Sequence, residues 1–247
     1  MSWHEGCNFF AHMPTSTTRM DAIERALRVS HLFQGVDGCV TDFARVAIRK
    51  QFHHGDFLWH HGDAATALTI ITSGLVKICQ PNQNGETAIV ALFGPRESIG
   101  DIAVISTGRY PADAVAITRD VEVLSIEKTP VLEAMHRDLA LSNAINRSLV
   151  SHSTALREKI RIMTAGPVER RLAALLLHLA ERFGDENDRG ETEIPVALSR
   201  NDLARLVGAT IETTIRTMSR WQKAGSLSTT AQGFVIHRLA DLETSKE

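Results

Sequence analysis

The stretch LSRNDLARLVGATIETTIRTMSRWQKAGSL, from Leu198 to Leu227, predicts two short helices joined by a tight turn. Ser199 is a residue type that caps the start of a helix, and Gly208 permits the chain to turn after that helix ends. Thr210 can cap a second helix that begins at Ile211. Two helices with this spacing and a glycine between them predict a helix-turn-helix.

The second helix of this stretch has two distinct sides, because successive residues of an α-helix are about 100° apart. The side expected in the core consists of Thr214, Thr217, Met218 and Trp221. The opposite side consists of Glu212, Arg216, Ser219 and Lys223, with Ile215 at its margin.

The charges at Glu212 and Arg216 have two interpretations. An ion pair one turn apart would contribute only ~0.2–0.5 kcal/mol and would leave Ile215 exposed without a role. In a DNA major groove, arginine can donate two hydrogen bonds to guanine and glutamate can accept one from cytosine. An apolar side chain can contact a thymine methyl group there. The sequence therefore favours base contacts by all three residues.

The residues around this stretch complete a winged helix-turn-helix over residues 165–247. An amphipathic helix, VERRLAALLLHLAERFG, begins at Val168, and Gly184 is expected to be its C-terminal cap. A polar loop, DENDRGETE, follows at 185–193. The segment LSTTAQGFVIHRL then predicts two short strands that turn at Gln232 and Gly233.

Residues 27–130 predict a compact antiparallel β-roll, preceded by an N-terminal arm at 1–26. From about Arg45 to Lys128, short runs of valine, isoleucine and leucine alternate with glycine-containing turns. The clearest hairpin is TALTIITSGLVKICQPNQNGETAIVALF, whose two strands should be joined across residues 81–86. The whole chain is therefore predicted to have an α+β fold.

Residues 131–164 predict one long dimerisation helix. Glycine is absent there, and AGP at 165–167 should end the helix and make a hinge. Apolar or near-apolar side chains recur at intervals of three and four, which approximates the seam of a coiled coil. A helix that packs only on its own domain is the alternative. Charged neighbours suited to the flanks of a dimer interface are Arg147, Arg157, Glu158 and Arg161. The expected seam consists of Ile145, Leu149, His152, Leu156, Ile160 and Met163.

Composition restricts the class of protein. The chain has 247 residues and a net charge of −2, so DNA binding would depend on the local basic patch between Ser199 and Gly225. It has neither a membrane-length apolar run nor a signal peptide, so we expect a cytoplasmic protein that does not bind membranes. The motifs of hydrolases, metalloproteases and nucleotide-binding enzymes are absent, so no enzyme is expected. The cysteines, Cys7, Cys39 and Cys79, are odd in number and widely spaced, which argues against disulfides and zinc.

Several motifs resemble those of the CRP/FNR family of transcriptional regulators. They are GDFLWHHGD at 55–63, SGLVKI at 73–78, the long helix, and the stretch from Ser199 to Leu227. The resemblance covers nearly everything after Ala26. It implies a cyclic-nucleotide-binding-like roll, a homodimer, a palindromic operator, and RNA polymerase as a partner if the protein is an activator. Two alternatives remain: an enzyme, and a sensor module that acts through a protein partner without binding DNA.

The resemblance also implies roles for individual residues. Ser199 and Arg200 should contact phosphate, while Glu212 and Arg216 should read a half-site with a TGA core. Ile215 stands where relatives often have serine or glycine, so the resemblance does not identify the outer bases of the half-site. The full set expected at the DNA is Ser199, Arg200, Thr210, Ile211, Glu212, Thr213, Ile215, Arg216 and Arg220.

The effector segment, SIGDIAVISTGRYPADAVAI at 98–117, departs from that of the cyclic-nucleotide-binding relatives. Those relatives have Gly-Glu and, further on, an Arg-Ser pair whose arginine neutralises the cyclic phosphate. Here Pro111 and Ala112 stand at the place of that pair, and Arg109 could substitute only if the loop were remodelled. Leu156 and Arg157 stand where a cyclic-AMP receptor has Thr-Ser, so cyclic AMP is not expected. The expected pocket residues are Gly100, Asp101, Arg109, Tyr110 and Leu156.

The sequence does not identify a cofactor. An iron–sulfur cluster is not expected, because Cys7 alone cannot supply about four thiolates. TGRYPADA at 107–114 is similar to the segment of the nitric-oxide-responsive branch of the family, and some gas sensors of the family bind haem. Candidate haem ligands in the roll and the long helix are His53, His54, His60, His61 and His152. Further candidates in the arm are Trp3, His4, Cys7, His12 and Met13.

Overall fold

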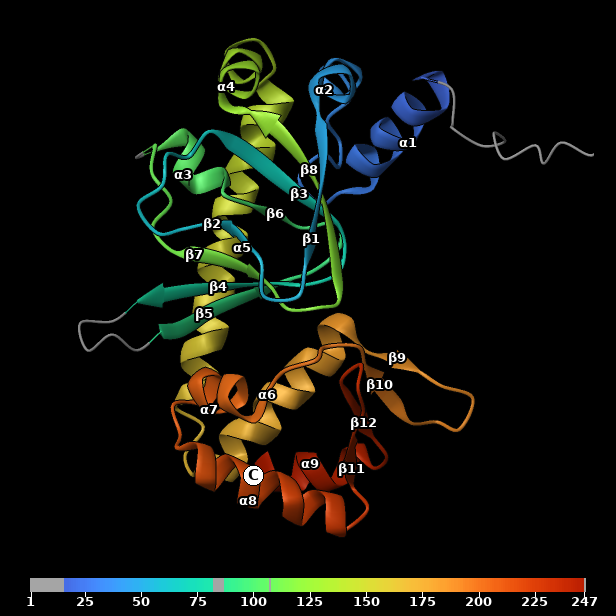
Figure 1. Ribbon diagram of the computed structural model, residues 1–247, viewed down its shortest axis with the longest axis vertical. Coiled ribbons are helices and arrows are strands. Elements are labelled where there is room, and N and C mark those ends of the chain that lie inside the picture. The colour runs from blue at the N-terminus through green and yellow to red at the C-terminus, as the bar shows by residue number, and fades with distance from the viewer. Residues whose placement is uncertain (1–15, 82–86, 107, 247) are drawn as a thin grey trace, which may run out of the picture.

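The computed structural model describes residues 16–81, 87–106 and 108–246, and it has an α+β architecture in two parts (Figure 1). A β-roll with its covering helices forms one part, and a smaller helical part lies at the other end of a long helix. The elements of the first part are α1 (Ser16–Val29), α2 (Val40–Val46), β1 (Ile48–His53), β2 (Phe57–Trp59), β3 (Ala67–Ser73), β4 (Val76–Pro81), β5 (Thr87–Phe93), β6 (Ser98–Ile99), α3 (Asp101–Ile105), β7 (Asp113–Ala116), β8 (Asp120–Glu127) and α4 (Lys128–Arg137). The long helix α5 (Leu139–Met163) connects them to α6 (Val168–Phe183), β9 (Asp185–Glu186), β10 (Thr192–Ile194), α7 (Arg200–Val207), α8 (Ile211–Lys223), β11 (Leu227–Thr229), β12 (Phe234–Ile236) and α9 (Leu239–Lys246).

The roll consists of two antiparallel sheets, with strand orders β1-β8-β3-β6 and β2-β7-β4-β5. In the second sheet β4 pairs with β5 from Val76↔Phe93 to Pro81↔Thr87, which confirms the predicted hairpin. Strand β3 is buried from Ala67 to Ile71 because it lies inside its sheet and is covered on both faces. This explains why its sequence is a continuous apolar run rather than an alternating one.

The prediction of an arm at residues 1–26 was wrong for its second half. Helix α1 crosses the expected boundary, and it buries Ile23 and Leu27 in the same core as Phe33 and Phe43. The arm residues named as ligands lie outside the described part of the chain.

The prediction of one continuous helix over 131–164 was also wrong, because the chain breaks between α4 and α5 at Asp138. This residue has an extended backbone, with φ −118° and ψ 102°. Its carboxylate accepts hydrogen bonds from the amides of Ala140 (2.8 Å) and Leu141 (3.2 Å), so it caps α5. The break after Met163 does occur as predicted: Gly166 has φ +96°, and α6 begins after Pro167.

The smaller part differs from the prediction in two places. The expected polar loop at 185–193 contains β9 and β10, which join β11 and β12 in one sheet of order β11-β12-β10-β9. Gly184 caps α6 as predicted, with an extended backbone (φ −85°), and a Cβ there would lie 2.4 Å from the carbonyl oxygen of Ala180. Helix α9 was not predicted; its Leu242 is fully buried in the core that contains α6.

The two parts share one apolar core. Leu75, Ile89 and Leu92 of the roll belong to the same buried cluster as the apolar face of α6 and residues of α7. Helix α7 lies against β5 in this junction. The helix-turn-helix is therefore packed directly on the sensor roll.

Candidate DNA-binding surface and effector pocket

Local side-chain chemistry sets the geometry of the helix-turn-helix. Ser199 accepts a hydrogen bond from the amide of Asp202 (3.0 Å), and Asp202 accepts one from the amide of Ser199 (3.2 Å), which together form a capping box. Gly208 ends α7 in the left-handed conformation, with φ 61° and ψ 51°. Thr210 then caps α8 by accepting from the amide of Thr213 (3.3 Å). The predicted bounds of the first helix and the predicted start of the second are confirmed.

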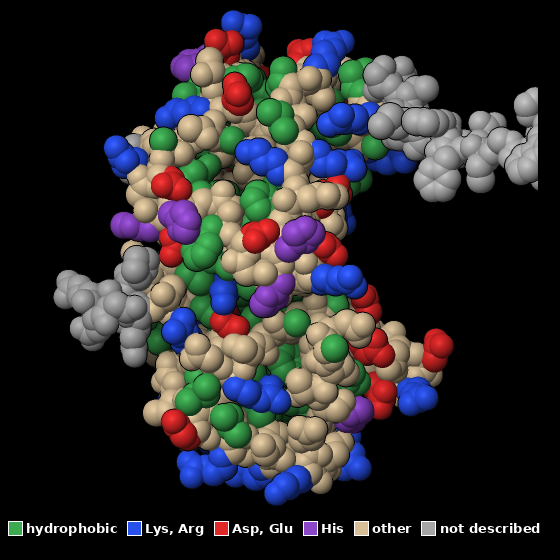
Figure 2. Space-filling model, viewed as in Figure 1, with side chains coloured by type: hydrophobic (Ala, Val, Ile, Leu, Met, Phe, Trp, Pro, Cys, Tyr) green, Lys and Arg blue, Asp and Glu red, His purple; other side chains and the backbone are tan. Residues whose placement is uncertain are grey.

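Helix α8 has the two sides that the sequence predicts. Thr214, Thr217, Met218 and Trp221 are buried. Glu212, Ile215 and Arg216 are exposed, and Ile215 keeps 45% of its surface accessible. Within the described residues neither Glu212 nor Arg216 has an ion-pair partner. Figure 2 shows lysine and arginine side chains gathered at the end of the molecule where α8 lies.

The other residues expected at the DNA are arranged in different ways. Arg200 donates to the Thr229 hydroxyl (2.7 Å) in the wing and lies over the Phe234 ring, and burial lowers its pKa. The Thr210 hydroxyl donates a hydrogen bond to the Thr213 hydroxyl (3.1 Å). Ile211 is exposed. Arg220 is exposed and pairs with Glu169 of α6 at 2.6 Å.

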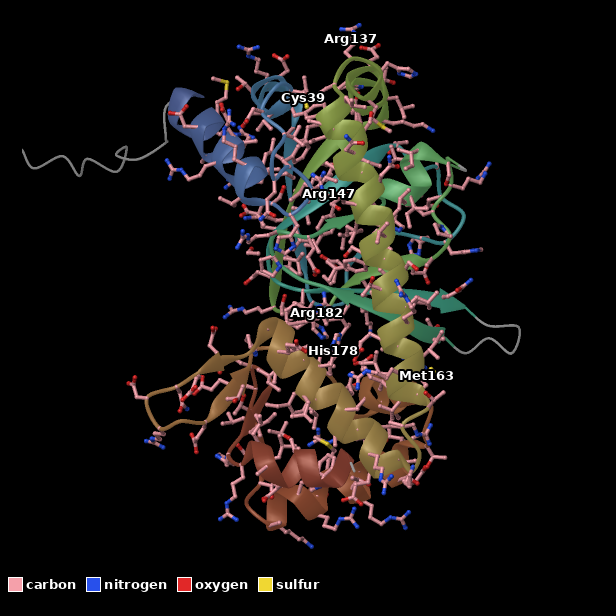
Figure 3. The ribbon with its side chains drawn as sticks, turned by 180° about the vertical axis from the view of Figure 1, so that it is seen from behind. Cys39, Arg137, Arg147, Met163, His178 and Arg182 are labelled. Atoms are coloured by element: carbon pink, nitrogen blue, oxygen red, sulfur yellow. The ribbon has the colours of Figure 1, made fainter. Side chains whose placement is uncertain are left out.

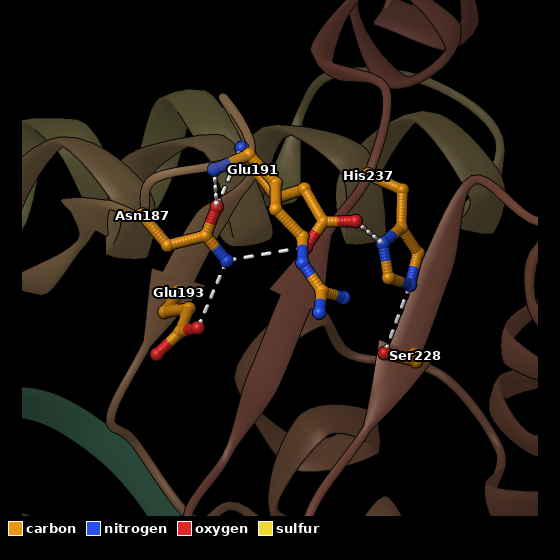
Figure 4. A network of polar contacts seen from close by, with 6 residues as sticks. Asn187, Glu191, Glu193, Ser228 and His237 are labelled. Atoms are coloured by element: carbon orange, nitrogen blue, oxygen red, sulfur yellow. Dashed lines mark hydrogen bonds and ion pairs between the residues drawn. The ribbon is translucent and has the colours of Figure 1, made fainter.

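A polar network holds the wing (Figure 4). His237 contacts Glu191 through Nδ1 (2.6 Å) and Ser228 through Nε2 (3.0 Å). Asn187 donates to Glu191 (3.1 Å) and to Glu193 (2.9 Å). Hydrogen bonds from His237 and Asn187 lower the pKa of the Glu191 carboxyl. The network fixes the hairpin of β9 and β10 against β11 and β12.

The first part of the seam predicted on α5 packs on its own chain. Ile145 is 1% exposed and belongs to the core of the roll, while His152 faces Asp101 of α3. Both residues therefore contact their own chain, and Leu149 is half-buried. At 100° per residue, Leu156, Ile160 and Met163 continue the same stripe toward the end of the helix, where they are exposed. The large apolar residues left exposed on α5 beyond its first turn are Val150, Leu156, Ile160 and Met163.

All four charged residues expected at a dimer interface contact their own chain. Arg157 donates to the Thr154 hydroxyl (3.4 Å). Arg147 donates to the carbonyl of Gln34 (3.2 Å). Glu158 pairs with Arg161 on the next turn and lies 3.6 Å from the His178 ring. Glu158 therefore already has partners within its own chain and does not depend on a second subunit for them.

A pocket of about 250 Å³ lies between the roll and α5. Trp59 and Tyr110 stack at 4.1 Å and form one wall, with Phe93 and Leu156 also lining the space. Gly100 has φ +80°, and a Cβ there would lie 3.0 Å from the Tyr110 ring. Both the left-handed backbone and the limited space favour glycine at this position. Trp59, Phe93 and His152 were not predicted as pocket residues.

Asp101 links the pocket to α5. Its side chain is 1% exposed and accepts hydrogen bonds from the Ile102 amide (2.9 Å), from Ser98 (3.3 Å) and from Ser148 of α5. Nδ1 of His152 lies 3.7 Å from Oδ1 of the same carboxylate. These contacts connect the pocket lining to the helix that leads to the DNA-binding part.

Arg109 does not line the pocket, contrary to the prediction. Its guanidinium donates to the carbonyl of Gly62 (2.7 Å) on the outer side of the roll. The candidate haem ligands His53, His54, His60 and His61 are all exposed and outside the pocket, so His152 alone lines it. The described residues contain no group of three or more histidine, cysteine or carboxylate side chains that could hold a metal ion.

The sequence analysis missed four long-range contacts, and the first two of them join the roll to the smaller part. Lys77 of β4 pairs with Asp202 of α7 at 2.7 Å, and Arg182 of α6 contacts both carboxylate oxygens of Glu97 at 2.8 Å. Lys159 of α5 donates to the carbonyl of Leu206, and Arg171 of α6 donates to that of Val207 (2.6 Å). Figure 3 shows Arg182 where α6 meets the roll and Met163 at the lower end of α5. In each contact the partners are far apart in sequence, so no local pattern points to them.

The two cysteines within the described residues, Cys39 and Cys79, are buried free thiols, as expected. Burial raises the pKa of Cys39 to about 12. Every helix in the described part of the chain falls short of the length and apolarity that a membrane-spanning segment requires.

A sensor roll with a long helix and a winged helix-turn-helix defines the class of two-domain, DNA-binding regulators. The family of the cyclic nucleotide-binding domain matches residues 49–138, and the Crp-like helix-turn-helix domain matches residues 170–245. The chain belongs to the CRP/FNR family and is a transcriptional regulator of that type, with a helix-turn-helix DNA-binding domain.

Curated relatives and solved structures agree with this assignment. The CRP-like cAMP-activated global transcriptional regulator of Mycobacterium tuberculosis is 26% identical over 208 residues, which cover 82% of this chain and 90% of the relative. The transcriptional activator protein anr of Pseudomonas aeruginosa is 26% identical over 192 residues, covering 76% and 75%. The structure of FixK2 from Bradyrhizobium japonicum has a TM-score of 0.69 at 19% identity, covering 81% of this chain and 96% of that one.

Proposed function

We propose that the protein binds a palindromic operator with a TGA-core half-site as a homodimer, and that α8 reads the bases. The observation that carries this proposal is the exposed triplet Glu212, Ile215 and Arg216, whose charged members have no ion-pair partner within the described residues. Arginine and glutamate on a helix that follows a helix-turn-helix turn suit guanine and cytosine in the major groove. An intrahelical ion pair would have been the competing explanation.

The backbone contacts would come from residues around α8. The N-terminus of α7 presents Ser199 and Arg200, and that of α8 presents Thr210, Ile211 and Thr213. Helix N-termini and arginine side chains bind phosphate without reading sequence. Arg220 has a smaller role in this proposal, because Glu169 already pairs with it.

The homodimer would form through the C-terminal half of α5. Leu156, Ile160 and Met163 lie on one side of this helix and expose between 43% and 54% of their surfaces. A row of exposed large apolar side chains on a long helix is typical of a helix that packs against a second copy. Two α8 helices related by a two-fold axis would then meet the two half-sites of a palindrome.

The effector would bind in the roll pocket and would not be cyclic AMP. Although the Mycobacterium tuberculosis relative is described as cAMP-activated, no lysine or arginine of the described residues lines this pocket. A buried phosphate without a cation is costly, and the nearby Asp101 carboxylate would repel it. A ligand that binds weakly can shift the regulator between its states only weakly.

Selection of operators from randomised DNA tests the proposal. With the wild type we expect palindromes with a TGA core. Arg216→Ala should lose preference at one base pair and cost ~1–3 kcal/mol per half-site. Arg25→Ala, which removes an exposed arginine from α1, is the control and should select the wild-type site. Unchanged base preference in Arg216→Ala would contradict the proposed reading, and failure of the wild type to enrich any sequence would contradict DNA recognition itself.

A further inference from the structure

The polar groups along the aromatic wall of the pocket already have partners. Trp59 donates through Nε1 to the carbonyl of Ala112 (3.1 Å), and the Tyr110 hydroxyl donates to that of Ala67 (3.0 Å). What these two residues offer to a ligand is therefore their apolar ring surface. The other residues of the wall are aliphatic or aromatic, including Ile78, Phe93 and Leu156.

The carboxylate of Asp101 is also occupied. Oδ1 accepts from the Ile102 amide, and Oδ2 accepts from Ser98 and Ser148. With 1% exposure this charge cannot be rehydrated, and the pocket lining within the described residues contains no cation to offset an anionic ligand. The pocket therefore selects against anions.

His152 is the remaining polar residue. Its Nδ1 faces Oδ1 of Asp101 at 3.7 Å, and its ring meets the edge of Phe93 at 86°. A neutral imidazole that directs its Nδ1–H toward a carboxylate has Nε2 left as an acceptor. No hydrogen bond to another described residue uses that nitrogen.

The size of the pocket restricts the ligand further. A cavity of ~150 Å³ lined by aliphatic and aromatic residues is enough to hold benzene. The volume here is about 250 Å³, which is smaller than the ~300–1,000 Å³ typical of sites for drug-sized ligands. A molecule of about two fused rings would fit it.

We propose that this pocket binds a small, neutral, mostly apolar molecule that donates one hydrogen bond, from an O–H or N–H group, to Nε2 of His152. The ligand would lie on the ring surfaces of Trp59 and Tyr110 and would touch α5 through His152 and Leu156. This inference extends the proposed function. Only the effector role of the ligand rests on that function. Binding itself is measured without DNA.

Calorimetry on the full chain with three naphthalene probes tests the ligand class. The donor 2-naphthol should bind about tenfold more tightly than 2-methylnaphthalene, which has a similar shape and no donor, because one hydrogen bond contributes about 1 kcal/mol or slightly more. The anion 2-naphthoate and cyclic AMP should give no binding heat. Absence of 2-naphthol binding, equal affinities for the two neutral probes, or tighter binding of either anion would overturn the proposal.

Variants at His152 locate the acceptor. His152→Phe keeps a ring and removes the acceptor, so it should bind both neutral probes equally. His152→Gln restores an acceptor and should recover part of the preference for 2-naphthol, even if the phenylalanine variant folds poorly. His136→Phe, on the exposed part of α4, is the matched control and should keep the wild-type preference. A preference that survives in His152→Phe would overturn the assignment.

Two further measurements separate this inference from the proposed function. If 2-naphthol binds as expected and operator affinity does not change at saturation, the ligand class stands and the effector role fails. Haemin is added in a separate titration. A haem absorption band that appears with the wild type and is lost in His152→Phe would overturn the neutral-ligand proposal, because haem carries two carboxylates.

Discussion

Nζ of Lys77 lies 2.7 Å from Oδ1 of Asp202, so a strand of the sensor roll is tied to the helix that begins the helix-turn-helix. Both side chains are largely shielded, with 19% and 15% of their surfaces exposed. Asp202 has a second role, because it also closes the capping box with Ser199. Burial alone would raise the pKa of Asp202, but hydrogen bonds from Lys77 and Ser199 lower it below its ordinary value.

Replacing Lys77 with methionine should reveal the strength of this link. The change removes the ammonium but keeps the length of the side chain, and it leaves a poorly hydrated carboxylate at Asp202. We expect the free energy of unfolding to fall by about 1–3 kcal/mol, measured by urea denaturation. The double variant Lys77→Met with Asp202→Asn should lose less than the sum of the two single changes, because it leaves no unpaired charge. Strictly additive losses would show that the two residues do not interact.

Lys159 should make stability depend on pH. Burial lowers the pKa of Lys159 from its ordinary 10.5 to about 8. Between these two values the unfolded chain binds the proton more readily than the folded chain, so the free energy of unfolding should rise with pH in this window. Below about 8 the cost of burying the ammonium is fully present, and it disappears as the pH approaches 10.5.

Urea unfolding at several pH values checks this dependence. Lys159→Met should flatten the rise relative to the wild type, because the titrating group is gone. Lys223→Met, which removes an exposed lysine of α8, should leave the rise unchanged. Equal slopes in the wild type and Lys159→Met would contradict the assignment.

The bounds of α7 and α8 could be predicted because their signals are local. Ser199, Gly208 and Thr210 each act on backbone groups within a few residues, so their types alone specify where the helices begin and end. Asp138 is an equally local signal, because aspartate favours the N-cap position. No glycine or proline lies beside it, so the break between α4 and α5 was not predicted. A search for capping aspartates inside long helical patterns would have found it.

Which part of the apolar stripe on α5 is buried within the chain could not be predicted in the same way. The spacing of three and four is the same in the part that packs on the roll and in the part that is exposed. Ile145 turned out to complete the roll and His152 to face Asp101, while Leu156 and Ile160 stay exposed. The choice depends on tertiary packing, as do the contacts of Lys77 and Lys159 with α7.

Ile160→Asp tests the corrected dimer face. This residue is 54% exposed in the single chain, so a charge there should not disturb the roll. In a dimer the aspartate would be buried without a partner, and we expect monomers by sedimentation and loss of operator binding. Ile48→Asp, at a residue that is 50% exposed on β1, is the control and should stay dimeric. A dimeric Ile160→Asp would place the interface elsewhere.

The last prediction concerns Ile215, the exposed apolar residue of the reading helix. Because 45% of its surface is accessible and it lies outside the buried side of α8, Ile215→Ser should leave the free energy of unfolding nearly unchanged. If the isoleucine contacts a thymine methyl group, serine removes that apolar contact while Glu212 and Arg216 still read their bases. Operator selection with this variant should therefore shift preference at an outer position of the half-site and keep the TGA core. Ile48→Ser, a loss of exposed isoleucine outside the DNA-binding part, should select the wild-type site. A changed base preference within the TGA core, or an unchanged preference at every position, would rule out contact between Ile215 and a thymine methyl group. The exposure of Ile215 would then have no explanation in base reading.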